Sequence, residues 1–142
     1  MLHEPLGSRD SQRARAAPVV YVIDDEPHLR ESSCFLLRSL DLACIQFPDG
    51  RAFLDALHGL QPGCILLDAR MRSVGGLEVQ DELGRRGVDW PIVFMSGYHD
   101  IPTVAEAMKN GAVEFLEKPF AEEELLAALH RGFVKLRKKG LN

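Results

Sequence analysis

Residues 19–25 read VVYVIDD, an uninterrupted apolar run that ends in two aspartates. A strand covered by helices on both faces is apolar at nearly every position, so this run predicts a central strand of a parallel sheet. Four further apolar runs follow, at residues 43–45, 64–67, 92–95 and 112–116. The third and fourth runs are apolar throughout, whereas Gln46 follows the second and Glu114 interrupts the fifth. We therefore expect the second and fifth strands at the two edges of the sheet.

Stretches with helical spacing lie between these runs. The positions expected to share a buried face are Leu29, Ser33, Leu36, Leu37 and Leu40 in the first helix, Phe53, Leu54, Leu57 and Leu60 in the second, and Leu125, Leu129, Phe133 and Leu136 in the last. The third helix is expected from about Leu77 to Gly87 and the fourth from Pro102 to Gly111, because proline suits a first turn and glycine a C-terminal cap. Five strand–helix units predict an α/β domain with a single, doubly wound, five-stranded parallel sheet and five helices.

The bulk properties indicate one globular domain. A chain of 142 residues, 46% hydrophobic and 27% charged, is long enough for one sizeable core and too short for two. No apolar run approaches the ~20 residues of a membrane span. Residues 1–17 lack the apolar centre of a secretory signal, and we expect a disordered leader there. The basic cluster near the C-terminus suits a helix end, so we expect no direct binding of nucleic acid.

The three cysteines, Cys34, Cys44 and Cys64, each stand among apolar neighbours and without the spacing of metal ligands. We expect buried, reduced thiols in a cytoplasmic protein.

Polar side chains follow four of the five predicted strands. They are Asp24, Asp25 and Glu26 after the first, Asp68 after the third, Ser96 after the fourth, and Lys118 with Pro119 after the fifth. Parallel α/β sheets place their sites outside the carboxyl ends of the strands. Converging carboxylates raise one another's pKa, and a hard cation such as Mg²⁺ relieves that repulsion. Taken alone, Asp24 and Asp25 could instead cap the next helix, but four suitable strand ends together favour a site.

Four motifs carry this pattern: VYVIDDEP at 20–27, ILLDARM at 65–71, FMSG at 94–97 and AMKNGAVEFLEKPF at 107–120. Together they resemble the receiver domain of bacterial response regulators, closest to the FixJ-like branch, from about Val19 to Gly132. The resemblance implies the flavodoxin-like receiver fold with strand order 2-1-3-4-5, a receiver domain over residues 18–137, and the start of a linker or tail at 138–142. It also implies a phosphoprotein of two-component signal transduction, which is not an enzyme beyond assisting its own phosphorylation and dephosphorylation.

The same resemblance implies roles for the residues at the strand ends. Asp68 would accept a phosphoryl group from a sensor histidine kinase, with Mg²⁺ as the cofactor. Asp25, Asp68 and the backbone carbonyl of Arg70 would ligate the metal directly, and Asp24 would act through a water. Lys118 would hold the phosphoryl oxygens, aimed inward by a cis peptide bond to the proline that follows it.

Output would be a shift between two conformers. Ser96, the switch hydroxyl, would move toward phosphorylated Asp68, and Phe115 would turn inward, although a plain core role for Phe115 fits the sequence equally well. The face of the fourth helix, fifth strand and fifth helix would then form a homodimer or engage an effector. Its candidate residues are Val104, Met108, Lys109, Glu114 and Leu125. Bulky Arg70 and Tyr98 would shield the acyl phosphate from water and slow its hydrolysis. His28 and His99 are expected on the surface, because the reacting histidine belongs to the kinase.

One residue departs from the family pattern: Arg72 stands where relatives usually have proline, which removes a rigid φ and adds charge near the site. Ser96 in place of the commoner threonine is a conservative change. FixJ-like regulators commonly carry a C-terminal helix-turn-helix domain for transcription regulation. The chain ends at Asn142, so we expect either an excised receiver or a single-domain regulator.

Three alternatives to a phosphorylated receiver remain. A receiver could signal by binding alone, but the full set of acids, hydroxyl and lysine speaks against it. A phosphatase that forms an aspartyl phosphate would need a second Asp at the position of Arg70. A flavin carrier of the flavodoxin type would need a phosphate loop after the first strand, and none follows residue 23.

Overall fold

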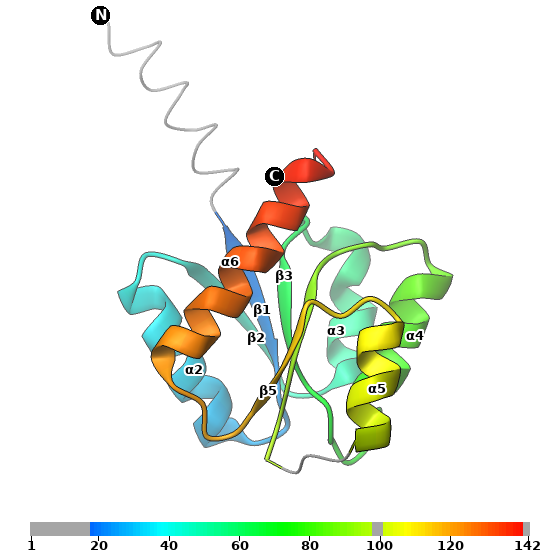
Figure 1. The fold of residues 1–142 in the computed structure, drawn as a ribbon, viewed down its shortest axis with the longest axis horizontal. Coiled ribbons are helices and arrows are strands. Elements are labelled where there is room, and N and C mark those ends of the chain that lie inside the picture. Colours follow the sequence, from blue (N-terminus) through cyan, green and yellow to red (C-terminus); the bar gives the residue numbers. More distant parts are fainter. Residues whose placement is uncertain (1–17, 98–100, 141–142) are drawn as a thin grey trace, which may run out of the picture.

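The computed structural model describes residues 18–97 and 101–140, and these form one α/β domain (Figure 1). The five strands are β1 (Val19–Ile23), β2 (Ala43–Phe47), β3 (Cys64–Asp68), β4 (Ile92–Ser96) and β5 (Glu114–Glu117). All neighbouring strands pair in parallel, in the order β2-β1-β3-β4-β5. This confirms the flavodoxin-like order and the placement of the second and fifth strands at the edges.

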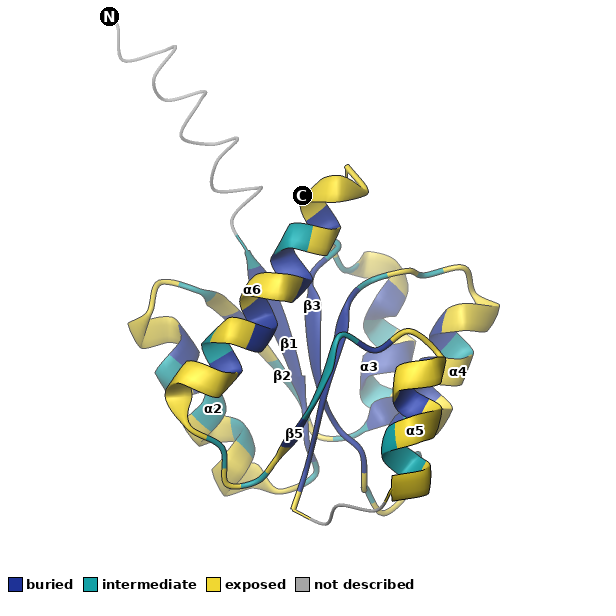
Figure 2. Cartoon of the chain, viewed as in Figure 1, coloured by how far each residue is buried: buried dark blue, intermediate teal, exposed yellow. Residues whose placement is uncertain are grey.

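Five α-helices cover the two faces of this sheet. They are α2 (Pro27–Ser39), α3 (Gly50–Ala56), α4 (Gly76–Arg85), α5 (Ile101–Lys109) and α6 (Glu122–Lys138), and a short 3-10 helix, η1 (Leu57–Gly59), follows α3. Figure 1 shows α2 and α6 on one face and α3, α4 and α5 on the other. Alternate residues of each central strand enter the two cores, with Val20 and Val22 toward α2 and α6, and Tyr21 and Ile23 toward the opposite face. The central strands β1, β3 and β4 are accordingly buried along their length between the helices, whereas the edge strands β2 and β5 are partly exposed (Figure 2).

The buried face of α2 differs from the prediction. Cys34 and Leu37 are fully buried, whereas Leu29 and Leu40 keep 43% and 37% of their surface exposed. The helix therefore contacts the sheet along a narrower line than the leucine spacing indicates. The expected face was drawn through the leucines and left out Cys34, a small apolar residue that fits closely against β2.

Two of the three cysteines are not reduced thiols, so that prediction was wrong. Cys34 on α2 and Cys44 on β2 form a disulfide, with Cα atoms 5.6 Å apart. The separation of their Cα atoms lies in the range that a disulfide requires. Their spacing along the chain does not reveal the contact, because it arises when α2 packs back over β1 and β2. Cys64 on β3 is buried and not bonded to another cysteine.

The ends of the elements follow the expected signals closely. Gly87 and Gly111, each the second residue after its helix (α4 and α5), both adopt positive φ, at 72° and 99°. β5 begins at Glu114, two residues later than predicted, because the Ala112 amide donates back to the Ala107 carbonyl and closes the end of α5. Among the described residues, no helix is long and apolar enough to cross a bilayer. Residues 1–17 lie outside the described part and α6 reaches Lys138, so the predicted domain boundaries stay a prediction.

Candidate functional site

Three carboxylates converge at the carboxyl edge of the sheet. β1 and β3 are adjacent and pair Ile23 with Leu67, so the residues that follow, Asp24 and Asp68, lie at the same level. Asp24, Asp25 and Asp68 each offer an oxygen within 4.8 Å of the others. Asp24 is fully buried, Asp68 is 6% exposed, and Asp25 is half-buried. The convergence expected from the strand ends is therefore present.

Lys118 lies between two of these acids. Its Nζ is 3.0 Å from Asp24 Oδ2 and 3.3 Å from Asp68 Oδ2. The residue follows β5 directly, and its backbone amide donates to the Ser96 carbonyl at 2.7 Å. The peptide bond from Lys118 to Pro119 is cis, as predicted. A single ammonium shared by two of three neighbouring carboxylates leaves the cluster short of positive charge.

The pKa of Asp68 is raised from 3.8 to about 6. Burial is the largest cause, the neighbouring Asp24 acts in the same direction, and the Arg70 amide and Lys118 act in the opposite direction. The Arg70 amide donates to Asp68 Oδ1 at 3.1 Å. Oxygen ligands held together without enough counter-charge are the kind of site that Mg²⁺ fits, since this ion is bound through carboxylates and keeps several waters. The residues present therefore suit the metal.

The helix that follows β1 is capped by Glu26, so the alternative that Asp24 and Asp25 merely cap it was wrong. Glu26 Oε1 accepts from the His28 amide at 2.9 Å. Asp24 Oδ1 instead accepts from the Glu26 amide at 3.0 Å, within the loop. The sequence held the signal, because Pro27 at the first helical position marks the residue before it as the cap. His28 is exposed, as expected.

Arg30 braces this loop from the first turns of α2, a role that the sequence did not reveal. Its Nη1 donates to the Asp24 carbonyl at 2.8 Å, and its Nε donates to Gln46 Oε1 at 3.2 Å. The guanidinium thus ties the backbone that carries the first acid to the edge strand β2. An arginine one turn into a helix gives no sign of this contact, which depends on where β2 ends.

The loop after β3 also reaches the acids. Asp25 Oδ2 accepts from the Arg72 amide at 3.0 Å and lies 3.4 Å from Arg72 Nε. The side chain of Arg70 is exposed at the same edge. A pocket of about 500 Å³ opens here, lined by Asp25, Glu26, Pro27, Arg70, Met71 and Arg72. The two arginines thus place positive charge on the side of the site that faces solvent.

Ser96 and Phe115 lie on the two strands beside the acids. Ser96 ends β4 and is 1% exposed, and β4 pairs Met95 with Asp68. Phe115 is half-buried, and its ring stacks on Phe94 with centroids 5.8 Å apart. Both residues lie on the strands that the sequence predicted for them, while their roles and the movement of the ring stay predictions. Tyr98 and His99, which the sequence also singled out, lie outside the described residues.

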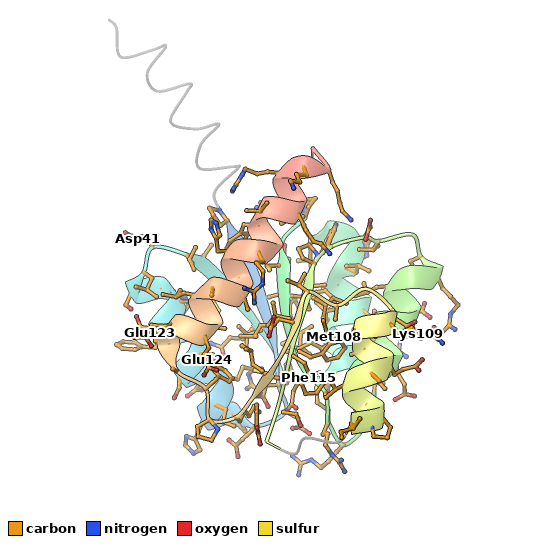
Figure 3. All side chains as sticks on the ribbon, in the orientation of Figure 1. Asp41, Met108, Lys109, Phe115, Glu123 and Glu124 are labelled. Atoms are coloured by element: carbon orange, nitrogen blue, oxygen red, sulfur yellow. A yellow bond between two sulfur atoms is a disulfide. The ribbon has the colours of Figure 1, made fainter. Side chains whose placement is uncertain are left out.

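The structure places the candidate residues of the expected output face, whose role stays a prediction, and it corrects one of them. Met108 and Lys109 are exposed on α5, and Phe115 lies on β5, the strand that α5 contacts (Figure 3). Glu114 is half-buried and pairs with Arg131 on α6 at 2.7 Å. Leu125 was wrongly included, because it is fully buried against the opposite face of the sheet.

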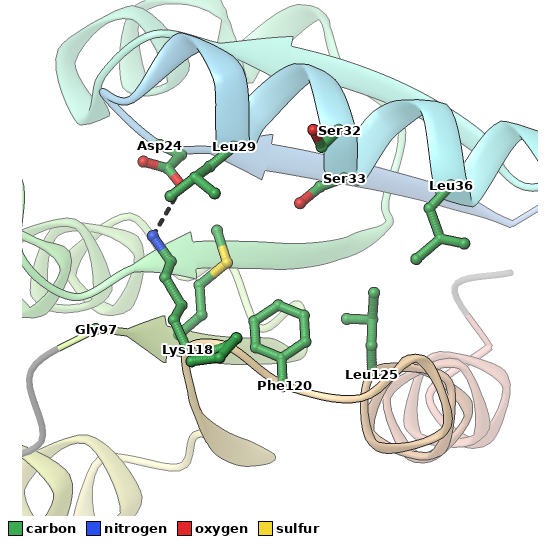
Figure 4. A pocket seen from close by; sticks show the side chains of 11 residues that line it. Asp24, Leu29, Ser32, Ser33, Leu36, Gly97, Lys118, Phe120 and Leu125 are labelled. Atoms are coloured by element: carbon green, nitrogen blue, oxygen red, sulfur yellow. Dashed lines mark hydrogen bonds and ion pairs between the residues drawn. The ribbon is translucent and has the colours of Figure 1, made fainter.

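A largely apolar pocket of about 510 Å³ lies on the α2 side of the acids (Figure 4). Its walls are Leu29, Ser32, Ser33 and Leu36 from α2, Met95 from β4, and Phe120 and Leu125 after β5, and it reaches Asp24 and Lys118. Phe35 on the same helix is 77% exposed. Apolar surface therefore borders the acidic site.

The fold and the site together define a class: a doubly wound α/β domain with an acidic, lysine-bridged site at the carboxyl edge of its sheet. Residues 20–130 match the family of the response regulator receiver domain, and the chain belongs to that family. It is thus a FixJ-like receiver domain of two-component signalling. Such a domain transmits a signal and is not a classical enzyme.

Similar proteins support this assignment. The transcriptional regulatory protein FixJ of Azorhizobium caulinodans is 44% identical over 121 residues, which are 85% of this chain and 57% of that protein. The response regulator protein TodT of Pseudomonas putida is 42% identical over 120 residues, 84% of this chain and 52% of that protein. This chain therefore spans little more than half the length of either relative.

Solved structures agree with the fold. The response regulator StyR superimposes with a TM-score of 0.81 at 39% identity, covering 87% of this chain and 62% of that one. The crystal structure of FixJ-N gives a TM-score of 0.78 at 32% identity, covering 82% of this chain and 94% of that one.

Proposed function

We propose that Asp68 is the phosphoacceptor of this receiver domain and that its phosphorylation requires Mg²⁺. The observation that carries the proposal is the position of Lys118, whose Nζ lies within 3.3 Å of both Asp68 and Asp24. A buried carboxylate with a raised pKa needs such a cation to stay ionised and nucleophilic. The same ammonium would then neutralise charge on a phosphoryl group carried by Asp68.

The reaction that we propose transfers one phosphoryl group between two side chains. An ionised Asp68 oxygen attacks the phosphorus of a phosphohistidine, the new P–O bond forms, and the P–N bond breaks with its electron pair going to the imidazole. Little covalent help is needed from the protein, so its part is positioning and electrostatic stabilisation. The Arg70 amide, which donates to Asp68 Oδ1, fixes one oxygen and leaves the other toward Lys118.

Asp25, Asp68 and the backbone carbonyl of Arg70 would hold the Mg²⁺, with Asp24 acting through a water. The metal would neutralise the acids and the phosphoryl oxygens when it is bound. In that arrangement Arg30 holds the Asp24 backbone carbonyl and the Glu26 amide holds Asp24 Oδ1.

Output would follow from Ser96, which is buried at the end of the strand next to Asp68. Its hydroxyl would hydrogen-bond the phosphoryl group, and Phe115 would then leave its present stacking on Phe94 and turn inward. The exposed residues Met108 and Lys109 would belong to the remodelled face of α5, β5 and α6, through which two phosphorylated chains dimerise.

The partner that supplies the phosphoryl group would be a sensor histidine kinase in the cytoplasm. The apolar pocket between α2 and Phe120 adjoins Asp24 and Lys118, so it offers the kinase an apolar docking surface beside the acceptor. Relatives are named as transcriptional regulators, and we propose that this receiver likewise controls a DNA-binding output domain while making no contact with nucleic acid itself.

Incubation with Mg²⁺ and acetyl phosphate, followed by intact mass measurement, tests the proposal. We expect one added phosphoryl group in the wild type and in Asp55→Asn, a control at an exposed acid of α3. We expect none in Asp68→Asn or with EDTA. Size-exclusion chromatography of the same samples should show a dimer only after phosphorylation. A wild type that gains no mass would instead support a receiver that signals by binding alone.

A further inference from the structure

Asp25 is already held by a cation that belongs to the chain. Its Oδ2 accepts from the Arg72 backbone amide at 3.0 Å and lies 3.4 Å from the Nε of the same residue. The two contacts join loops that are 47 residues apart in sequence and that flank the acid cluster from β1 and β3. Arg72 therefore occupies one oxygen of a carboxylate that the proposed function assigns to the metal.

The residue type at this position decides whether the contact exists. Proline, usual in receivers at the position of Arg72, has neither an N–H donor nor a charge, so it could make neither contact. Arginine brings both. Arginine in place of the usual proline thus adds a specific interaction with Asp25.

The two contacts differ in how easily they are released. The side chain of Arg72 is 87% exposed, whereas that of Asp25 is only 23% exposed. An ion pair with one partner in solvent is weak and is screened by salt. A divalent ion that approaches Asp25 can therefore displace the guanidinium, which moves into solvent with little loss of free energy. The backbone amide of Arg72 is not free to move in this way, because the loop fixes its position.

We propose that Arg72 is a tethered cation that competes with Mg²⁺ for Asp25 and so sets the metal concentration at which the site fills. This inference rests on the proposed function, because it requires Asp25 to be a metal ligand. In the metal-free protein the guanidinium lowers the repulsion among the acids. On metal binding its positive charge opposes the ion and weakens binding, by about twofold to fivefold at low ionic strength for an exposed pair.

Isothermal titration of Mg²⁺ into the phosphate-free protein measures this directly, without any phosphorylation assay. Arg72→Gln keeps the backbone amide and removes the charge, and we expect it to bind Mg²⁺ about twofold to fivefold more tightly than wild type. Arg72→Lys keeps the charge and should remain near wild type. Arg85→Gln is the matched control for net charge, because Arg85 is an exposed arginine at the far end of α4 and should leave the affinity unchanged.

Salt separates electrostatic competition from a change in loop shape. The ratio between Arg72→Gln and wild type should shrink toward one when KCl is raised from about 20 mM to about 500 mM, because screening removes the effect of an exposed charge. Equal affinities of Arg72→Gln and wild type at low salt would overturn the inference, as would an equal gain in Arg85→Gln. Mg²⁺ binding that Asp25→Asn leaves intact would overturn the metal site itself and hence the proposed function.

Discussion

Replacing Asp68 by asparagine should stabilise the metal-free protein, because the ionised carboxyl is held in a place that disfavours its charge. The pKa of Asp68 rises from 3.8 to about 6, and burial is the largest cause. A rise of about two units corresponds to about 3 kcal/mol between the ionised and neutral forms. Asparagine has one oxygen and one NH₂ group, so it cannot accept from both the Arg70 amide and Lys118. This loss offsets part of the gain, and we expect a net stabilisation of about 1–2 kcal/mol.

The stability difference between Asp68→Asn and wild type should depend on pH. A carboxyl whose pKa is higher in the folded state binds its proton more tightly there, so the wild type loses stability as the pH rises from about 4 to about 6. The advantage of Asp68→Asn should therefore be present at pH 7.5 and smaller at pH 5. Urea unfolding in EDTA at both values measures it. Saturating Mg²⁺ should reduce or reverse the advantage, because the ion binds the folded wild type more tightly than the variant.

Asp55→Asn serves as the control for this experiment. Its side chain is 67% exposed on α3, so its replacement should change the free energy of unfolding by less than about 0.5 kcal/mol. The reasoning would be refuted by an Asp68→Asn protein that is less stable than wild type in EDTA at pH 7.5. A difference that is the same at pH 5 and pH 7.5 would show that the gain does not come from the charge of Asp68.

Three further changes test the packing and chemistry around the site. Gly76→Ala should destabilise the fold by about 1–3 kcal/mol, because the added Cβ would lie 2.7 Å from the Asp68 carbonyl oxygen. Gly84→Ala on the same helix has open space around it and should stabilise the fold by up to about 1 kcal/mol. Urea unfolding measures both. Gln80→Leu should be neutral or stabilising by about 1 kcal/mol in the same assay, because Gln80 Oε1 is buried without a hydrogen-bond partner among the described residues. The variant also removes the bond from Gln80 Nε2 to the Ala107 carbonyl, but that carbonyl still accepts from the Ala112 amide. Arg70→Ala should shorten the lifetime of the phosphorylated form in intact-mass time courses, because it removes the bulky group beside Asp68.

Much of this structure follows from the sequence, because the relevant signals are local. An apolar run predicts a strand buried on both faces, and the residue after it lies at the carboxyl edge of the sheet. That rule alone gathers Asp24, Asp68, Ser96 and Lys118 at one edge, and the family resemblance adds their expected roles. Gly87 and Gly111 end their helices as expected because a positive φ favours glycine.

The features that the sequence did not predict depend on how elements meet in space. The Cys34–Cys44 disulfide requires α2 to pack against β2, so a spacing of ten residues along the chain does not indicate it. Arg30 reaches Asp24 and Gln46 because β2 happens to end beside the first turns of α2. The face of α2 was misjudged for the same reason: helical periodicity gives a set of apolar positions, and only the neighbouring strand decides which of them it covers.

Lys118 and Arg72 neutralise the same acidic cluster in different ways, and the difference follows from burial. The Lys118 side chain is 16% exposed and pairs with two buried acids, so its removal would leave buried charge unpaired. The Arg72 side chain is 87% exposed and pairs with the most accessible of the three acids. A divalent ion entering from solvent meets the exchangeable cation and not the fixed one. The proposed site can therefore take up metal without losing the lysine that its phosphorylated state requires.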